Sequence, residues 1–116
     1  MSEASSLGAR ALALSRERFE RATEARALFV LGEIAALGAG GDRVVAERHY
    51  QQALALAEEL GVRPLVGQCH LGLARLKRRT SEREPWRRHL AIATTTFQEL
   101  GMSFWRQQAD REAAAG

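Results

Sequence analysis

The stretch AERHYQQALALAEELG, residues 46–61, decides the fold, because a second stretch forty residues later, WRRHLAIATTTFQELG at 86–101, follows the same plan. Both carry histidine at the fourth position and end in Leu-Gly. Small or apolar residues advance by 4, 3, 4 and 3 in each, the spacing of one helix face. The two stripes are Ala46, Tyr50, Ala53, Ala57 and Leu60, and Trp86, Leu90, Ala93, Phe97 and Leu100. This period predicts stacked copies of one supersecondary unit, each completed by its neighbour.

The composition is that of a single all-α domain. The chain has 116 residues, of which 46% are hydrophobic and 27% charged, and only two prolines. Ala, Leu, Glu, Gln and Arg dominate, and these residues favour helices over strands. Residues 1–6 are expected to be disordered, and residues 7–116 to form one domain.

Charge, cysteine content and hydropathy limit the class of protein. The net charge is +3, and almost all of the basic residues are arginine. A net charge of this size is too small to indicate nucleic-acid binding, so nucleic acid is an unlikely partner. With Cys69 as the single cysteine, no internal disulfide forms. The chain shows neither a signal peptide nor a membrane span, which predicts a soluble, cytoplasmic protein.

Turn residues predict where the helices begin and end. Helices are expected over 25–37, 43–60, 64–79, from about 84 to 100, and over 104–114. Asp42 is expected to cap the second helix after the Gly-rich turn, and Gly61 and Gly101 to end the second and fourth. Ser81 and Glu84 stand at capping-box spacing, and Ser103 is expected to cap the last helix.

The N-terminal third allows two interpretations. Ala13-Leu14 stands forty residues before Ala53-Leu54, so residues 8–18 resemble the second helix of a half-repeat. We favour a turn near residues 19–22, with Thr23 as the next cap, which gives about six helices. Because residues 9–31 hold no proline or glycine, the alternative is one long helix over 9–37 that exposes its stripe to another chain.

The helix pairs resemble tetratricopeptide repeats (TPRs). This family asks for a Leu-Gly pair in the first helix, present at 31–32 and 71–72, and for small, aromatic and small positions in the second, filled by Ala46, Tyr50 and Ala53. The resemblance implies an α-solenoid of stacked antiparallel hairpins: half-repeat 8–22, repeats 23–61 and 63–101, and a C-terminal capping helix over 103–114. In the later copy, Trp86 replaces Ala46 and is expected to be covered by the final helix or to face a partner.

Residues 49–73 are more specifically similar to the TPR tails of large bacterial ATPase and adenylate or guanylate cyclase signalling proteins. This resemblance implies a scaffold that mediates protein or peptide binding in bacterial signalling. It says little about activity, because the enzymatic domains of those proteins have no counterpart in this chain.

No residues assemble into a convincing catalytic or metal site. Cys69-His70 lacks further ligands at the spacing of structural zinc, and Cys69 falls on a buried row, where a thiol is inert. We therefore expect no enzyme activity, no cofactor and no metal.

Two groups of residues are candidates for binding. Residues off the buried stripes predict a partner surface: Arg26, Glu33, Gln68 and Arg75. Beyond Arg75 follows a basic patch, for which the preferred interpretation is a solvated helix end and the alternative a site for phosphate or an acidic peptide: Lys77, Arg78, Arg79, Arg83, Arg87 and Arg88. The leading hypothesis is a scaffold for an unidentified protein or peptide. The alternatives are a homodimer, particularly through residues 9–24, and a detached regulatory tail of a cyclase-type protein.

Overall fold

The computed structural model describes the backbone of residues 3–38 and 42–116, together with the side chains of residues 10, 13, 14, 16–38 and 42–116. This part of the chain holds five α-helices and no strand, which confirms the all-α prediction. The helices are α1 (Glu3–Leu37), α2 (Arg43–Leu60), α3 (Arg63–Arg79), α4 (Arg83–Leu100) and α5 (Ser103–Ala115).

Most of the predicted helix ends are confirmed. Asp42 Oδ1 accepts from the backbone N–H groups of Val44 and Val45, both at 3.1 Å, as an N-cap does. Gly61 and Gly101 end α2 and α4 with φ of 72° and 68°, a left-handed conformation that glycine adopts without steric cost.

Two predicted caps are wrong. Ser81 has a φ of 59°, and the cap position of α4 is Glu82, whose side chain makes no capping hydrogen bond. Ser103 is the first residue of α5, after the cap position Met102. In both turns a backbone hydrogen bond closes the end of the preceding helix, from Glu82 N–H to the Lys77 carbonyl and from Met102 N–H to the Phe97 carbonyl, each at 2.9 Å. The next helix begins without a side-chain cap.

The turn expected near residues 19–22 does not form, because α1 runs unbroken from Glu3 to Leu37. Contacts with the end of α2 hold this stretch in the helix: Arg18 donates to the Leu60 carbonyl at 2.9 Å, and Arg21 pairs with Glu59 at 2.7 Å. Thr23 donates its hydroxyl to the Phe19 carbonyl within the helix and is not a cap. Residues 3–6, within the segment 1–6 expected to be disordered, belong to α1, and residues 1–2 lie outside the described part.

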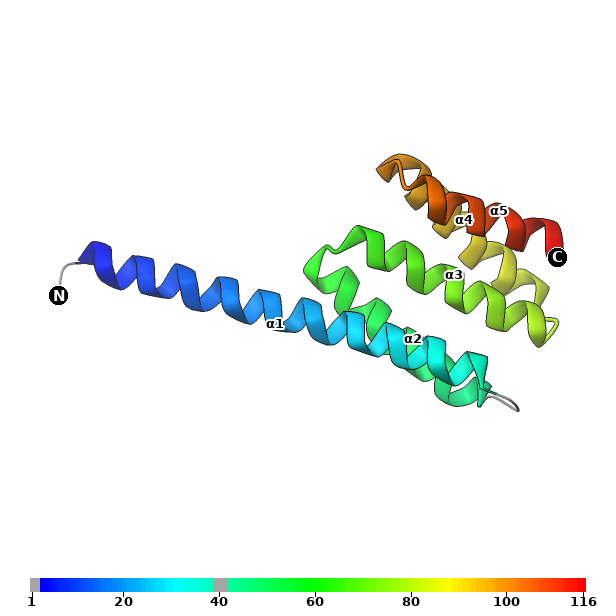
Figure 1. Ribbon diagram of the computed structural model, residues 1–116, viewed down its shortest axis with the longest axis horizontal. Coiled ribbons are helices and arrows are strands. Elements are labelled where there is room, and N and C mark those ends of the chain that lie inside the picture. The colour runs from blue at the N-terminus through cyan, green and yellow to red at the C-terminus, as the bar shows by residue number, and fades with distance from the viewer. Residues whose placement is uncertain (1–2, 39–41) are drawn as a thin grey trace.

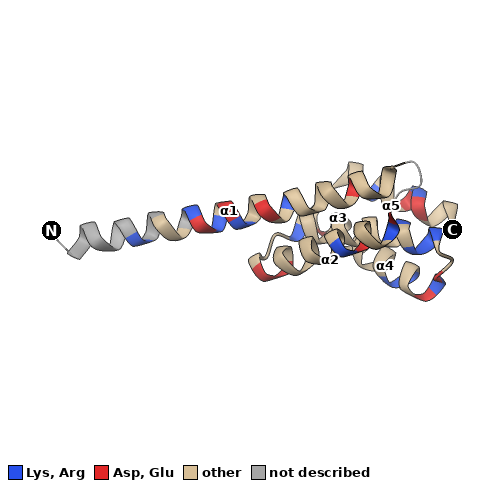
Figure 2. Ribbon diagram, turned by 90° about the horizontal axis from the view of Figure 1, so that it is seen from below, with Lys and Arg blue, Asp and Glu red and all other residues tan. Residues whose placement is uncertain are grey.

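The helices pack mainly against their neighbours in the chain (Figure 1). α1 lies along α2, α3 along α4, and α5 covers α4. In addition α1 contacts α3 and α3 contacts α5, whereas α2 and α4 make no contact in the described part. The N-terminal half of α1 projects beyond the end of α2, and the molecule measures 61 × 31 × 21 Å (Figures 1 and 2).

Two apolar clusters form the core, and they contain four of the five residues of each repeated stripe. The first cluster joins α1, α2 and α3 around Tyr50, which is fully enclosed with Ala46, Ala53 and Ala57. The second joins α3, α4 and α5 around Phe97, with Trp86, Leu90 and Ala93. Trp86 is covered, since it belongs to the cluster that contains Ala109 of the final helix.

The Leu-Gly glycines let helices approach Tyr50 closely. A Cβ atom at Gly32 would lie 2.9 Å from Tyr50 Cδ1, and one at Gly72 would lie 2.6 Å from Tyr50 Cε1. Any larger side chain would therefore displace the ring or the helix. One tyrosine of α2 thus meets the glycine of α1 and the glycine of α3.

This double contact makes the two hairpins non-equivalent. The α1 residues that face α2 are Ala25, Phe29, Gly32, Glu33 and Ala36. Their counterparts forty residues later also face α2: Leu65, Cys69, Gly72, Leu73 and Leu76. Helices α1 and α3 therefore present the same repeat face to α2.

The other face of these two helices differs in what covers it. In α3 it packs on α4 through Gly67, His70, Leu71 and Ala74. The α1 counterparts Ala27, Val30, Leu31 and Ile34 are exposed. Leu71 is 0% exposed, whereas Leu31 is 45% exposed. The face that α4 seals in the second hairpin is open in the first.

Candidate partner-binding surface

A small hollow lies where α1, α2 and α3 meet, with a volume of about 40 Å³. Its lining combines apolar and polar side chains: Glu33, Ala36, Leu37, Tyr50, Gly72, Arg75, Leu76 and Arg79. Gly72 allows the helices to approach here, and the C-terminal turn of α1 supplies the rim. The position of the hollow therefore depends on the same close packing around Tyr50 that builds the core.

Hydrogen bonds fix two sides of this hollow. Tyr50 donates its hydroxyl to Glu33 Oε1 at 2.6 Å, and burial together with this carboxylate raises the pKa of Tyr50 far above its usual value, so the hydroxyl stays protonated. Arg79 donates to the Ala36 carbonyl at 2.8 Å, where a cation suits the C-terminal end of α1. Arg75 is half-buried and makes no ion pair within the described residues, which leaves its guanidinium free to bind.

The structure brings together two of the four residues predicted to bind a partner. Glu33 and Arg75 line the same hollow. Arg26 lies on the open face of α1, beside Thr23, Ala27, Val30 and Leu31. Gln68 is half-buried on α3 and belongs neither to the lining of this hollow nor to the open face of α1. The sequence analysis did not place Tyr50 and Arg79 in this hollow. It assigned Tyr50 to the core and Arg79 to the basic patch, whereas both residues line the hollow where α1, α2 and α3 meet.

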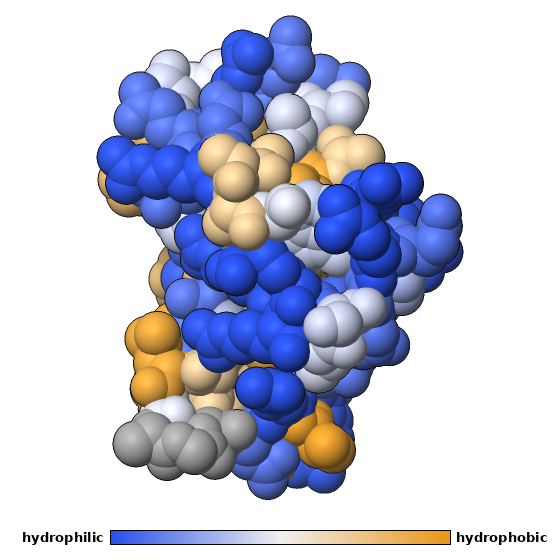
Figure 3. Space-filling model, turned by 90° about the vertical axis from the view of Figure 1, so that its right-hand side faces the viewer, coloured by the Kyte–Doolittle hydropathy of each residue, from blue (hydrophilic) through white to orange (hydrophobic). Residues whose placement is uncertain are grey.

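The basic patch lies at the end of the molecule where α3 ends and α4 begins. Figure 3 looks onto this end, where hydrophilic surface predominates and the hydrophobic side chains form separate small areas. Arg78 Nε binds Glu112 of α5 at 2.6 and 3.0 Å, and Glu112 is buried. Arg83 stacks over the Trp86 ring, 5.8 Å from its centroid.

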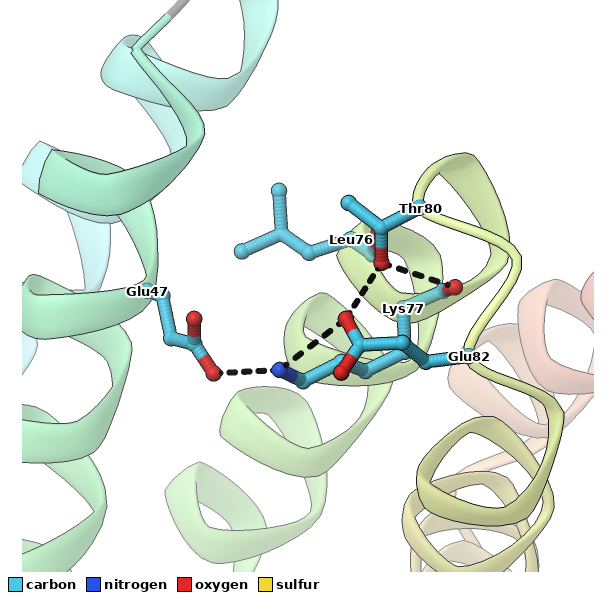
Figure 4. Close-up of polar contacts among 5 residues, drawn as sticks. All are labelled: Glu47, Leu76, Lys77, Thr80 and Glu82. Atoms are coloured by element: carbon cyan, nitrogen blue, oxygen red, sulfur yellow. Dashed lines mark hydrogen bonds and ion pairs between the residues drawn. The ribbon is translucent and has the colours of Figure 1, made fainter.

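Lys77 is neutralised by a network that spans α2, α3 and the following turn (Figure 4). Its Nζ lies 2.6 Å from Glu47 Oε1 and 3.4 Å from Glu82 Oε2, and the hydrogen bond to Glu47 raises its pKa. Thr80 donates its hydroxyl to Glu82 at 2.5 Å, and this contact with the Lys77 charge lowers the pKa of Glu82.

The predicted basic patch is therefore divided in two. Intramolecular partners engage Lys77, Arg78 and Arg79, so these cations hold helices together. Arg83, Arg87 and Arg88 on α4 are exposed. A hollow of about 230 Å³ between the two groups is lined by Lys77, Arg78, Ser81, Glu82, Arg83, Trp86 and Gly116.

A histidine pair that the sequence did not suggest joins α3 to α4. His70 Nδ1 lies 2.9 Å from His89 Nδ1, and the rings are 5.2 Å apart. This hydrogen bond requires one nitrogen to donate and the other to accept, so both nitrogens cannot carry a proton. Burial lowers the pKa of His70, and burial with the neighbouring His70 lowers the pKa of His89 to about 4. Only the antiparallel packing of the helices reveals this pair.

Cys69 is fully enclosed, and burial raises the pKa of its thiol to about 12, which disfavours the reactive thiolate. Among the residues that the structure describes, no three side chains of the metal-binding types converge on one point.

None of the helices described has both the length and the apolar character needed to cross a bilayer. The comparisons with known proteins also give no match: no family model, curated protein or solved structure matches this chain.

Proposed function

We propose that the chain is a non-enzymatic helical scaffold of the TPR kind, which binds a segment of another protein on the side where α1, α3 and α5 follow one another. The contacts of α1 with α3 and of α3 with α5, while α2 and α4 stay apart, support this side as the inner surface of a short solenoid. A cytoplasmic role in bacterial signalling fits the same proposal.

The observation that carries this proposal is Arg75, which lies beside the hollow between α1 and α3 and has no ion-pair partner among the residues that the structure describes. A half-buried arginine without an acidic partner gains most from an incoming carboxylate, since a charge-assisted hydrogen bond strengthens where water is partly excluded. Around it, Leu37 and Leu76 offer apolar contact, and Arg79 adds a second cation. The partner segment that fits carries an acidic side chain next to an apolar one.

Site-specific photocrosslinking tests the surface. A photoreactive amino acid is placed at Gln68, and the matched control is Arg87, an exposed arginine on α4. We expect crosslinking in cells of the native host to give one adduct from Gln68 and none from Arg87. Arg75→Glu should then abolish the adduct formed from Gln68, while circular dichroism remains that of the unaltered chain. Equal adducts from Arg87, or an adduct insensitive to Arg75→Glu, would reject this surface.

A further inference from the structure

The open face of α1 is a continuous apolar stripe. From Phe19 to Leu37 its exposed residues advance by 4, 4, 3, 4 and 3, so they lie along one side of the helix: Phe19, Thr23, Ala27, Val30, Ile34 and Leu37. Phe19, Ile34 and Leu37 are 73%, 62% and 76% exposed. We call these six residues the α1 stripe. It extends for about 27 Å along the helix.

The internal repeat indicates that this face is built to meet another helix. Positions 27, 30 and 34 correspond to Gly67, His70 and Ala74, which in α3 lie against α4. Because α1 turns its other face to α2, no helix in the described part of the chain covers the stripe. A row of large exposed apolar side chains of this length is a feature of binding surfaces.

The order of side-chain sizes along the stripe favours a second copy of the same helix. When two copies lie antiparallel, Ala27 of each faces Val30 of the other and Thr23 faces Ile34, so that small residues meet large ones. Phe19 then faces Leu37, at the two ends of the contact. A parallel pair would instead oppose Phe19 to Phe19 and Ile34 to Ile34, and would leave gaps at Thr23 and Ala27.

Charges flanking the stripe match in the same arrangement. Arg26 and Glu33 are on the same side of α1, seven residues apart, and Arg26 is exposed beside the stripe. Antiparallel pairing places Arg26 of one copy near Glu33 of the other. The opposing charges add selectivity for this register over a parallel one.

We propose that the chain forms a homodimer in which the α1 stripes of two copies pack antiparallel. This surface borders the hollow around Arg75, because Leu37 of the stripe and Glu33 beside it also line that hollow, so the dimer and the proposed partner site share this edge. Each copy covers in the other the face that α4 covers in α3, and the interface is isologous, as a two-fold dimer requires.

Sedimentation equilibrium of the full chain tests the dimer. We expect a concentration-dependent dimer, and Ile34→Glu is expected to raise its dissociation constant at least about a hundredfold, because it buries an unpaired carboxylate. Val44→Glu is the matched control: Val44 is 75% exposed on α2, off the stripe, and this change is expected to leave dimerisation intact. A chain that stays monomeric at about 100 μM, or dimerises equally as Ile34→Glu, would overturn the proposal.

Cysteine crosslinking tests the direction of the helices. Thr23→Cys and Ile34→Cys chains are mixed and oxidised, with the enclosed Cys69 left in place. An antiparallel pair brings the two new thiols together and gives a disulfide-linked dimer of one chain of each kind. Neither variant alone is expected to crosslink, since equal positions then lie about 16 Å apart along the axis. Crosslinking of Thr23→Cys by itself would overturn the antiparallel arrangement.

Discussion

In the hairpin of α3 and α4, the face that carries Gly67, Leu71 and Ala74 is sealed by the partner helix, whereas in the hairpin of α1 and α2 the corresponding face is open to solvent. The two hairpins share their Leu-Gly pair and their stripe spacing. A repeated sequence thus specifies which positions are apolar, but the neighbours available in space decide which helix covers them.

The cause of the difference lies at Tyr50. Its ring is large enough to meet a glycine from each side, and both α1 and α3 carry one at the right height. In α4 the equivalent position is Leu90, and the aromatic side chain that meets a glycine of α3 is Phe97, against Gly67. The two glycines of α3 thus meet rings from different helices, Gly72 the ring of Tyr50 in α2 and Gly67 the ring of Phe97 in α4.

Truncation of the two equivalent leucines, one in each hairpin, should give the largest difference in the free energy of unfolding. Leu71→Ala removes a fully buried side chain and should lower the free energy of unfolding by about 3 kcal/mol, through lost burial and the cavity left behind. Leu31→Ala should cost less than about 1 kcal/mol, because Leu31 is half-exposed in the single chain. Urea denaturation under conditions where the chain is monomeric measures both. Equal costs would mean that the hairpins pack alike.

The two arginines that link α3 to neighbouring helices should give the next largest difference in the free energy of unfolding. Arg78→Met leaves the buried Glu112 carboxylate without its partner, and we expect a loss of about 2 kcal/mol. Arg79→Met removes only a hydrogen bond to an exposed helix end and should cost about 0.5 kcal/mol. Thermal unfolding of the two variants compares the link to α5 with the link to α1. A larger loss for Arg79→Met would contradict the assignment.

The pH dependence of stability should come from the second hairpin. The pKa of both His70 and His89 is lowered in the folded chain, so the unfolded chain binds more protons as the pH falls below about 6.5. Stability should therefore be full above that pH and decline toward pH 4. The expected loss is on the order of 1–2 kcal/mol, because His89 is partly exposed and its charge is screened.

Glutamine variants locate the source of this slope. His89→Gln should flatten the decline between pH 6.5 and 4 in urea titrations. His49→Gln is the control, since the α1 residue at the position equivalent to His70 is Val30. A slope that survives His89→Gln and disappears in His49→Gln would show that another site titrates.

The two turns should give the smallest effects, of opposite sign. Asp42→Ala removes a side-chain cap and should lower stability by about 1 kcal/mol. Ser81→Gly relieves a left-handed backbone conformation and should raise stability by about 0.5 kcal/mol. Differential scanning calorimetry can resolve both shifts. Stabilisation by Asp42→Ala would show that the first turn does not depend on its cap.

Much of the helical layout could be predicted, and the candidate surface only in part. The span of α2, the breaks at Gly61 and Gly101 and the burial of the two stripes depend on local signals, and all are confirmed except at Leu100, which is half-buried. The turn near residues 19–22 was wrong, because contacts with the end of α2 stabilise the helix there. Glu33 and Arg75 were candidates, but their proximity to Tyr50 and Arg79 depends on how three helices cross.

By itself the sequence determined helices α2 to α5, the caps at Asp42 and Gly61, and the positions that are apolar, because helix propensity and backbone conformation act over a few neighbouring residues. Only the tertiary structure decided that His70 meets His89, that Glu112 holds Arg78, and that α1 continues as one helix with an open stripe. Those outcomes depend on which helices come within contact distance, and a periodic pattern fits more than one such arrangement.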